Sequence, residues 1–176
     1  MQELNQNLNK DLNKDLNKDL DKDLDKDLGK DLGKDLNKDS GSNLNVIAQN
    51  LLNRFCHALD VSNYDALLAC FAPDGTWVRL GKRLTGHSEI LHELTGNRPK
   101  TLKTIHLVSN VIIDKRTEES AAGQFYMVAY RHDSATPPPY PVPKPTVIGM
   151  CPVELTLIRD QWLLKFLQVG PFLFAN

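Results

Sequence analysis

The stretch KTIHLVSNVIID, residues 103–114, decides the fold because it is long, rich in β-branched residues and bounded by charged ones. A run of this kind is typical of a β-strand. Strict alternation gives it two faces, one with Ile105, Leu107, Ser109, Val111 and Ile113, the other with His106, Val108, Asn110 and Ile112. Both faces are too apolar to face water. We therefore expect one face to cover helices and the other to pack on a second copy, in a homodimer through the sheet.

The segments on either side of this strand predict an α+β domain over residues 43–176. After it, further strand-like runs follow at residues 120–132, 146–158 and 161–174. Before it, the pattern predicts helices at residues 44–60, 62–71 and 87–94, a turn at residues 72–75 and a strand at residues 76–80. Ser62 and Asp65 have the spacing of a capping box at the start of the second helix. Helices first and an antiparallel sheet afterwards is the order of an α+β fold.

Residues 1–42 form a separate low-complexity arm in which the tetrapeptide NKDL is repeated. A leucine recurs every fourth residue from Leu4 to Leu36. On a helix each step of four residues overshoots a full turn by about 40°, so these leucines form no sustained stripe. The arm is predicted to be disordered or loosely helical. The alternative is an oligomerising or partner-binding arm that becomes helical on contact.

Composition and charge argue against several classes of protein. The net charge is −1 at pH 7 and no basic stripe is present, so nucleic acid is not expected as a partner. We expect a cytoplasmic protein without membrane contact, because no apolar signal segment or bilayer-spanning stretch is found. Three cysteines without C-x-x-C spacing fit a reducing compartment. No cofactor and no metal are expected, because the chain lacks a phosphate-binding loop, and His87 and His92 lack metal-ligand spacing.

Four phrases, taken in order, resemble the SnoaL-like, or nuclear transport factor two-like, superfamily. They are FCHALDVSNYDALLACFAPDGTWV, LTGHSEI, TIHLVSNVIID and GQFYMVAYRHD, and the resemblance covers about residues 46–172. It implies a cone-shaped barrel in which a strongly curved antiparallel sheet wraps around the N-terminal helices and leaves an apolar pocket at one end. Members include ketosteroid isomerases, polyketide cyclases, scytalone dehydratase and non-catalytic domains, so the fold leaves the function open.

Only one of the three catalytic positions of ketosteroid isomerases is matched in this sequence. The position of the general-base aspartate falls on Arg79, and that of the oxyanion tyrosine falls on Phe55. Glu154 occupies the remaining acid position. The isomerase set of catalytic residues is therefore not carried over.

The resemblance to scytalone dehydratase extends further. Asp60 ends the first helix just ahead of an aromatic-Asp pair at residues 64–65, and Thr104 with His106 matches a T-x-H at the start of a long strand. The second histidine of that enzyme falls on Arg131 or His132, and a shift of one residue exchanges the faces of these two side chains. The resemblance thus implies an Asp/His pair.

Asp60 and His106 are the candidate catalytic residues. Imidazole changes charge near neutral pH, which suits general acid–base catalysis. We expect Asp60 to orient His106 and stabilise its charged form, while His106 moves a proton at a carbon α to a carbonyl or at a departing hydroxyl. This predicts a cofactor-independent small-molecule enzyme of the dehydratase, isomerase or cyclase type. The ligand would be apolar, carbonyl-containing or polyketide-like, and bound by Phe55, Trp77, Arg79, Tyr126, Arg131 and Glu154.

Each candidate has a structural alternative. His106 could be a buried neutral histidine bonded to Asn110 or to the backbone, and Asp60 could cap the second helix. Glu154 could form a salt bridge at the rim with Arg79 or Arg131, and the aromatic residues could belong to the core. The chain would then be a non-catalytic ligand-binding or assembly module of the same fold.

The insertion DSATPPPYPVPKPT, residues 133–146, holds six of the ten prolines. A loop of this length is ordinarily a lid, a binding loop or a disordered segment, and prolines favour extended conformations. We expect a semi-rigid flap near the mouth of the pocket. A recognition segment for a proline-binding module is the alternative.

Overall fold

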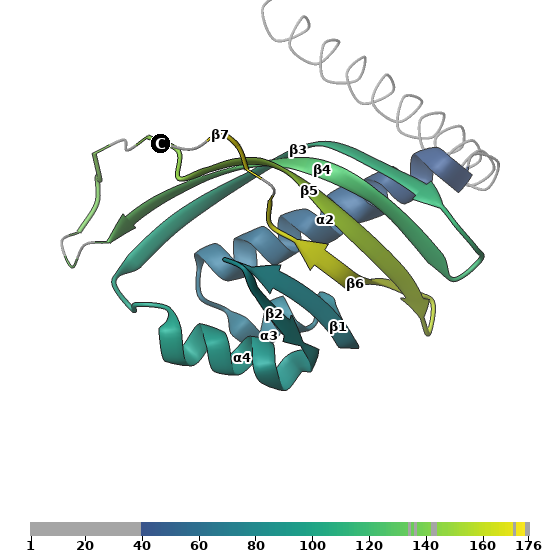
Figure 1. Cartoon of the computed structure of the whole chain (residues 1–176), viewed down its shortest axis with the longest axis horizontal. Helices are drawn as coiled ribbons and strands as arrows, with labels where there is room; N and C mark the ends of the chain where they lie inside the picture. The colour runs from purple at the N-terminus through teal and green to yellow at the C-terminus, as the bar shows by residue number, and fades with distance from the viewer. Residues whose placement is uncertain (1–39, 134, 136, 142–143, 171, 175–176) are drawn as a thin grey trace, which may run out of the picture. The chain divides into compact units, whose positions relative to one another are not determined.

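The computed structural model describes residues 40–133, 135, 137–141, 144–170 and 172–174, so residues 1–39 of the predicted arm lie outside the described residues. The described helices are α2 (Ser40–Asp60), α3 (Tyr64–Leu68) and α4 (Gly86–Asn97). The strands are β1 (Phe71–Arg79), β2 (Lys82–Thr85), β3 (Leu102–Lys115), β4 (Ser120–Asp133), β5 (Val147–Ile158), β6 (Gln161–Gln168) and β7 (Phe172–Phe174) (Figure 1). Within these ranges, no helix has the length and hydropathy needed to cross a membrane.

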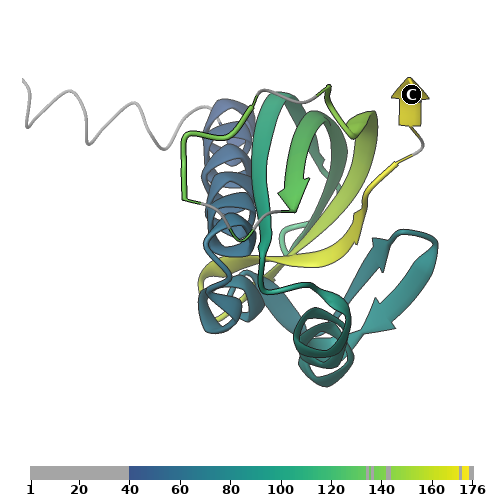
Figure 2. The same ribbon diagram turned by 90° about the vertical axis from the view of Figure 1, so that its left-hand side faces the viewer.

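The strands form one strongly curved sheet that does not close into a complete barrel (Figures 1 and 2). Its order is β2-β1-β6-β5-β4-β3, with β7 paired to β5. α2 lies along the concave side of the sheet (Figure 2). The predicted α+β cone is confirmed, with one difference in strand direction. β1 runs parallel to β6, because β1 precedes the antiparallel meander in the chain and joins it at the far edge.

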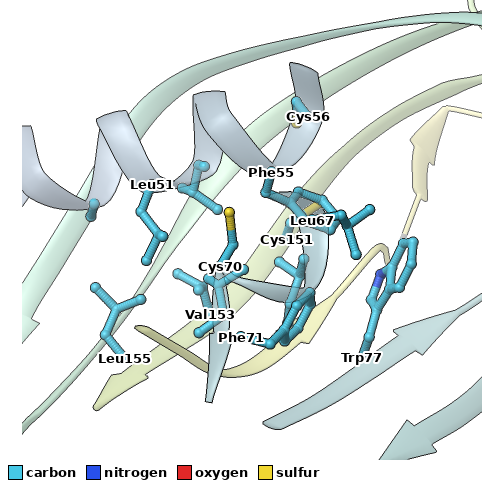
Figure 3. Packing of buried hydrophobic residues seen from close by; sticks show 14 of the residues in the cluster. Leu51, Phe55, Cys56, Leu67, Cys70, Phe71, Trp77, Cys151, Val153 and Leu155 are labelled. Atoms are coloured by element: carbon cyan, nitrogen blue, oxygen red, sulfur yellow. The ribbon is translucent and has the colours of Figure 1, made fainter. Parts of the chain in front are cut away.

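The core lies between α2 and the sheet, because α2 presents one apolar face to the strands. Leu44, Ala48, Leu52 and Phe55 recur at helical spacing and are buried. The ring of Phe55 contacts Phe71 and Trp77 edge to face, with centroids 5.7 Å and 5.3 Å apart (Figure 3). These ring contacts hold β1 against the C-terminal half of α2, the half that ends at Asp60.

The segments around α2 and α3 depart from their predictions. α2 begins at residue 40 and not at residue 44. The cap of α3 is Asn63, whose side chain accepts a hydrogen bond from Ala66 N at 3.1 Å. Ser62 does not cap, because it has a positive φ of 58°, outside the extended region that an N-cap residue occupies. Residues 72–75 belong to β1 and do not form the predicted turn, and β2 was not predicted.

A β-bulge divides β3 into two halves with opposite alternation. Asn110 has a positive φ of 52°, and the register with β4 shifts between Ser109 and Ile112. The extra residue places Ile113 on the same face as His106, so the prediction of strict alternation was wrong. Gly123 on β4 makes room for the bulge, since a Cβ there would lie 1.9 Å from the carbonyl oxygen of Ile112.

Candidate active site

Asp60 and His106 come together where the end of α2 meets the first half of β3. The Nδ1 atom of His106 lies 2.6 Å from Asp60 Oδ1, and the backbone N–H of His106 donates to Asp60 Oδ2 at 3.0 Å. The carboxylate therefore accepts two hydrogen bonds from one residue, which fixes the imidazole ring relative to the strand. Both side chains are largely shielded, with 17% of Asp60 and 11% of His106 exposed.

Thr104 and Arg98 support this pair from the side. Thr104 Oγ1 donates to Asp60 Oδ1 at 2.7 Å, and Arg98 Nη2 donates to Thr104 Oγ1 at 2.8 Å. The same guanidinium nitrogen donates to the carbonyl oxygen of Leu59 at 3.2 Å, at the last turn of α2. Arg98 thereby ties the helix end to the strand that carries His106.

The hydrogen bonds decide which tautomer of His106 fits the pair. An ionised carboxylate accepts hydrogen bonds but cannot donate, so Nδ1 must carry the proton that faces Asp60. A neutral His106 then has its lone pair on Nε2, where a proton can be accepted. The protein partner of the ring is thus Asp60 and not Asn110.

The environment of Asp60 acts on its pKa in two directions. Burial alone would raise the pKa of the carboxyl, because it disfavours the charged form. Hydrogen bonds from His106 and Thr104, together with attraction to a charged His106, outweigh burial and hold the pKa of Asp60 below its usual range. The lowered pKa means that the folded protein stabilises the ionised carboxylate, and that this carboxylate in turn stabilises the fold above about pH 4.

Asp60→Asn is expected to lower the free energy of unfolding by about 1–3 kcal/mol at pH 6, since charged hydrogen bonds to buried donors are lost. The difference from the wild type should shrink as pH falls below about 4, because the wild-type carboxyl then becomes protonated and loses the same stabilisation. Urea unfolding of the wild type and the variant at pH 6 and pH 3 measures the loss of stability and its decrease at low pH. Asp114→Asn, at an exposed position of β3, is the control and should change stability little at either pH. An equal loss for Asp60→Asn at both pH values would contradict the assignment.

A small cavity of about 60 Å³ lies on the inner face of the sheet beside His106. Four of the residues predicted to bind a ligand line it: Phe55, Trp77, Arg79 and Arg131. Arg131 pairs with Thr104 across β3 and β4, and so shares the inner face. His132 lies on the outer face, where its ring packs at a tilt against Tyr140 with centroids 5.0 Å apart. Of the two residues, Arg131 lines the small cavity, and both line a second pocket.

A second, larger pocket of about 510 Å³ adjoins the first and shares Thr104 and Arg131 with it. Asp60 also lines it. Its remaining walls on β3 and β4 are Lys103, Ile105, Tyr130 and His132, which alternate with Thr104 and Arg131 and so belong to the outer face of the sheet. Tyr140 and Pro141 of the proline-rich insertion complete the wall. These two described residues of the insertion therefore lie at the same pocket as Asp60, the last residue of α2.

Two of the residues predicted to bind a ligand, Tyr126 and Glu154, lie away from these two pockets. Tyr126 is 42% exposed on the outer face of the sheet, because residues 121, 125, 127 and 129 of β4 are the ones that turn inward. Glu154 is likewise exposed on β5, and it lines a different pocket with Gln124 and Phe166. The alternative of a rim salt bridge from Glu154 to Arg79 is also not found, because Arg79 pairs with Glu93.

Glu93 and Arg98 are site residues that sequence reasoning missed. Glu93 lies on α4 and accepts from Arg79 Nη1 at 3.3 Å and from Lys82 Nζ at 3.0 Å. These hydrogen bonds, that from Lys82 above all, lower the pKa of Glu93 and keep it ionised although it is buried. Neither residue belongs to a recognisable motif. A charged side chain on the apolar side of a predicted helix was the one available signal for Glu93.

The three cysteines carry no role in the site. Cys56, Cys70 and Cys151 are free and buried in the core. Burial raises the pKa of each thiol, so all three stay protonated and unreactive at neutral pH. They pack as small apolar side chains.

The fold is a curved α+β cone, and Asp60 and His106 lie together at its inner face. Residues 47–168 match the sequence profile of the SnoaL-like domain. The chain therefore belongs to the SnoaL-like domain family. A comparison with curated proteins finds no match.

Solved structures share the fold at low sequence identity. A Novosphingobium aromaticivorans protein, provisionally named a scytalone dehydratase, is 19% identical with a TM-score of 0.56 over 69% of this chain and 79% of its own. Hexachlorocyclohexane dehydrochlorinase of Novosphingobium barchaimii is 12% identical with a TM-score of 0.59 over 74% and 87%. A Catenulispora acidiphila protein in complex with S-DNPA is 18% identical with a TM-score of 0.59 over 72% and 93%. At these identities the similarity establishes the fold.

Proposed function

We propose that this protein is a cofactor-independent enzyme of the dehydratase or isomerase type, with His106 as the general base and Asp60 as the residue that orients it. The observation that carries the proposal is the hydrogen bond of 2.6 Å between His106 Nδ1 and Asp60 Oδ1 at the wall of a cavity. A structural histidine needs a hydrogen-bond partner but no cavity. A general base needs both, because its second nitrogen must reach a substrate.

The proposed reaction begins with proton transfer from a carbon next to a carbonyl group to Nε2 of His106. Asp60 stabilises the imidazolium that forms, as a carboxylate beside a histidine does in other acid–base sites. In an elimination, the electron pair of the C–H bond forms a C=C bond, the C–O bond breaks, and the departing hydroxide takes the proton from His106 and leaves as water. In an isomerisation, His106 returns the proton to another carbon.

The structural neighbours support the elimination variant. A dehydrochlorinase removes hydrogen and chloride from adjacent carbons, and a dehydratase removes hydrogen and hydroxide. Both reactions require a base at a C–H bond, and neither name implies a redox cofactor. The same class of chemistry on this fold would need the base that His106 provides.

A panel of aromatic β-hydroxy ketones, the corresponding β-hydroxy carboxylates and β,γ-unsaturated ketones, incubated with the protein in D₂O and followed by NMR, tests the proposal. We expect one class to show exchange of the α-hydrogen with deuterium, followed by formation of the conjugated product. The full chain is used, with heat-denatured protein as the blank. Saturable binding of panel members without exchange or product would overturn the enzymatic proposal and favour the ligand-binding module.

We further propose that the outer face of the sheet forms a homodimer. Leu107, Ile112 and Tyr126 project from the outer face of β3 and β4, and each is exposed by 42% or more. A run of large apolar side chains on neighbouring strands is uncommon on the surface of a monomer. A second copy of the same face would remove it from water with the symmetry that most homodimers use.

Leu107→Arg is expected to convert a dimer into a monomer at micromolar concentration, because the dimer would have to bury an unpaired charge. Sedimentation velocity measures the halving of the mass. Val46→Arg is the matched control, since Val46 on α2 is 59% exposed, close to the 53% of Leu107, but lies away from the sheet. A wild type that is already monomeric, or two variants with equal effects, would refute this interface.

A further inference from the structure

Three arginines from separate elements converge on the small cavity beside His106. Arg79 comes from β1, Arg98 follows α4, and Arg131 comes from β4, and all three line the same 60 Å³ space. Carboxylates balance this charge in part. Glu93 pairs with both Arg79 and Lys82, and Asp60 is occupied by His106 and Thr104. Arg131 forms no ion pair with any residue that the structure describes.

The guanidinium groups are close enough to disturb one another. Burial lowers the pKa of Arg79, Glu93 raises it, and the positive charges of Arg98 and Arg131 lower it again. Burial likewise lowers the pKa of Arg98, and Arg131 adds to that effect. Arginine remains protonated at neutral pH despite such shifts. The cavity wall therefore holds a net positive charge whose repulsion an anion would relieve.

Two buried N–H donors in this wall lack an acceptor. Arg98 is 7% exposed, and its Nε atom has no hydrogen-bond partner among the described residues. The same holds for Nε1 of Trp77, whose side chain is 1% exposed and whose residue also lines the cavity. Leaving a buried donor without a partner costs about 1–3 kcal/mol, so such donors in a native protein call for an explanation. A ligand that brings oxygen acceptors supplies one.

We infer that the substrate is an organic carboxylate whose charged head group occupies the cavity formed by Arg79, Arg98 and Arg131, while its apolar body leaves past the exposed Arg131, which lines both spaces, toward the larger pocket. The size of the two spaces fits this division. The small cavity admits a head group, whereas the pocket of about 510 Å³ has the size and the apolar walls typical of sites for small molecules. Guanidinium groups bind carboxylates through paired hydrogen bonds.

This inference rests on the proposed function in placing the ligand beside His106, and it narrows the substrate. With the carboxylate held by the arginines, the carbon next to the head group lies nearest to His106. Negative charge that develops there on proton removal would face the same guanidinium groups, and preorganised charge of this kind lowers a reaction barrier. Neutral apolar ketones would lack this anchor.

The test is calorimetric binding of 2-naphthoate and of its neutral analogue 2-naphthamide to the full-length protein. We expect 2-naphthoate to bind more tightly, with a preference that declines as salt is added. Arg131→Gln should weaken 2-naphthoate binding about ten- to a hundredfold and leave 2-naphthamide unchanged, because one charged partner is lost. Arg131 is chosen because it forms no ion pair with a described residue, so its replacement should not destabilise the fold.

Arg159→Gln is the control for net charge, because Arg159 is exposed in the turn between β5 and β6. It should leave the binding of both probes unchanged. Equal binding of the two probes by the wild type, or equal effects of the two arginine substitutions, would overturn the inference. Carboxylate binding that depends on Arg131, without turnover of any panel member, would uphold the anion site while refuting the enzymatic proposal. Turnover of neutral ketones, with no preference for 2-naphthoate over 2-naphthamide, would uphold the enzymatic proposal and refute the anion site.

Discussion

His106→Gln is expected to lower kcat by about 10²–10⁴-fold on any substrate that the wild type converts, because it removes the general base. Glutamine has a similar length, and the backbone N–H of residue 106 still donates to Asp60 Oδ2, so the local structure should survive. The measurement is the rate of product formation at saturating substrate. An unchanged far-UV circular dichroism spectrum would show that the loss is chemical and not structural.

His92→Gln is the matched control for this substitution. His92 is exposed on α4 and lines neither of the two pockets at the site. It should leave kcat unchanged. Wild-type turnover by His106→Gln would end the acid–base proposal, whatever the position of the ligand.

Phe55→Ala is expected to lower the free energy of unfolding by about 3–5 kcal/mol, the usual cost of removing a large buried aromatic ring. Phe55 is 1% exposed and contacts both Phe71 and Trp77, so its loss would leave a void that α2 and β1 cannot easily close (Figure 3). The same void would enlarge the cavity beside His106. Urea unfolding followed by far-UV circular dichroism gives the free energy.

Val46→Ala provides the comparison on the same helix. Val46 faces solvent on α2, and an exposed substitution of this kind ordinarily changes stability by less than about 0.5 kcal/mol. If Phe55→Ala behaved like Val46→Ala, the ring cluster would not be the centre of the core. The two substitutions therefore separate core packing from helix propensity.

The contact between Asp60 and His106 could be predicted from the sequence because each residue stands out locally. His106 interrupts an apolar strand, and Asp60 places a negative charge at the C-terminal end of a helix, where the helix dipole disfavours it. Both are exceptions to the pattern that surrounds them. The structure accounts for both, because each offsets the unfavourable position of the other.

The arginine cavity could not be predicted in the same way. Arg98 lies in the short connection after α4, where a charged residue is ordinary, and its burial follows from tertiary contacts with Leu59 and Thr104. Arg131 and Glu154 lie on strands whose alternation is clear from the sequence. The phase of that alternation, meaning which of the two sets of side chains faces the core, is not. Phase depends on which face meets α2, and a single strand does not carry that information.

The bulge at Asn110 also explains why the faces of β3 could not be assigned by alternation. Asn is among the residues that most readily adopt positive φ, but a lone Asn in a strand also fits an ordinary exposed position. The second signal lies on the neighbouring strand, where Gly123 has no side chain to obstruct the Ile112 carbonyl. Asn110 and Gly123 indicate a bulge only when they are known to lie on neighbouring strands, and that arrangement is known from the fold.

That bulge makes the length of β3 harder to change than its composition. A deletion of Asn110 would restore uninterrupted alternation along β3. Only one half of the strand could then keep its present side chains on the inner face. If Ile113 kept its place in the core, Thr104 and His106 would turn away from Asp60. If the histidine kept its place, the far half of the strand would expose its apolar side chains. The fold can accommodate single substitutions along β3, whereas the loss of one residue would separate His106 from Asp60 and Thr104.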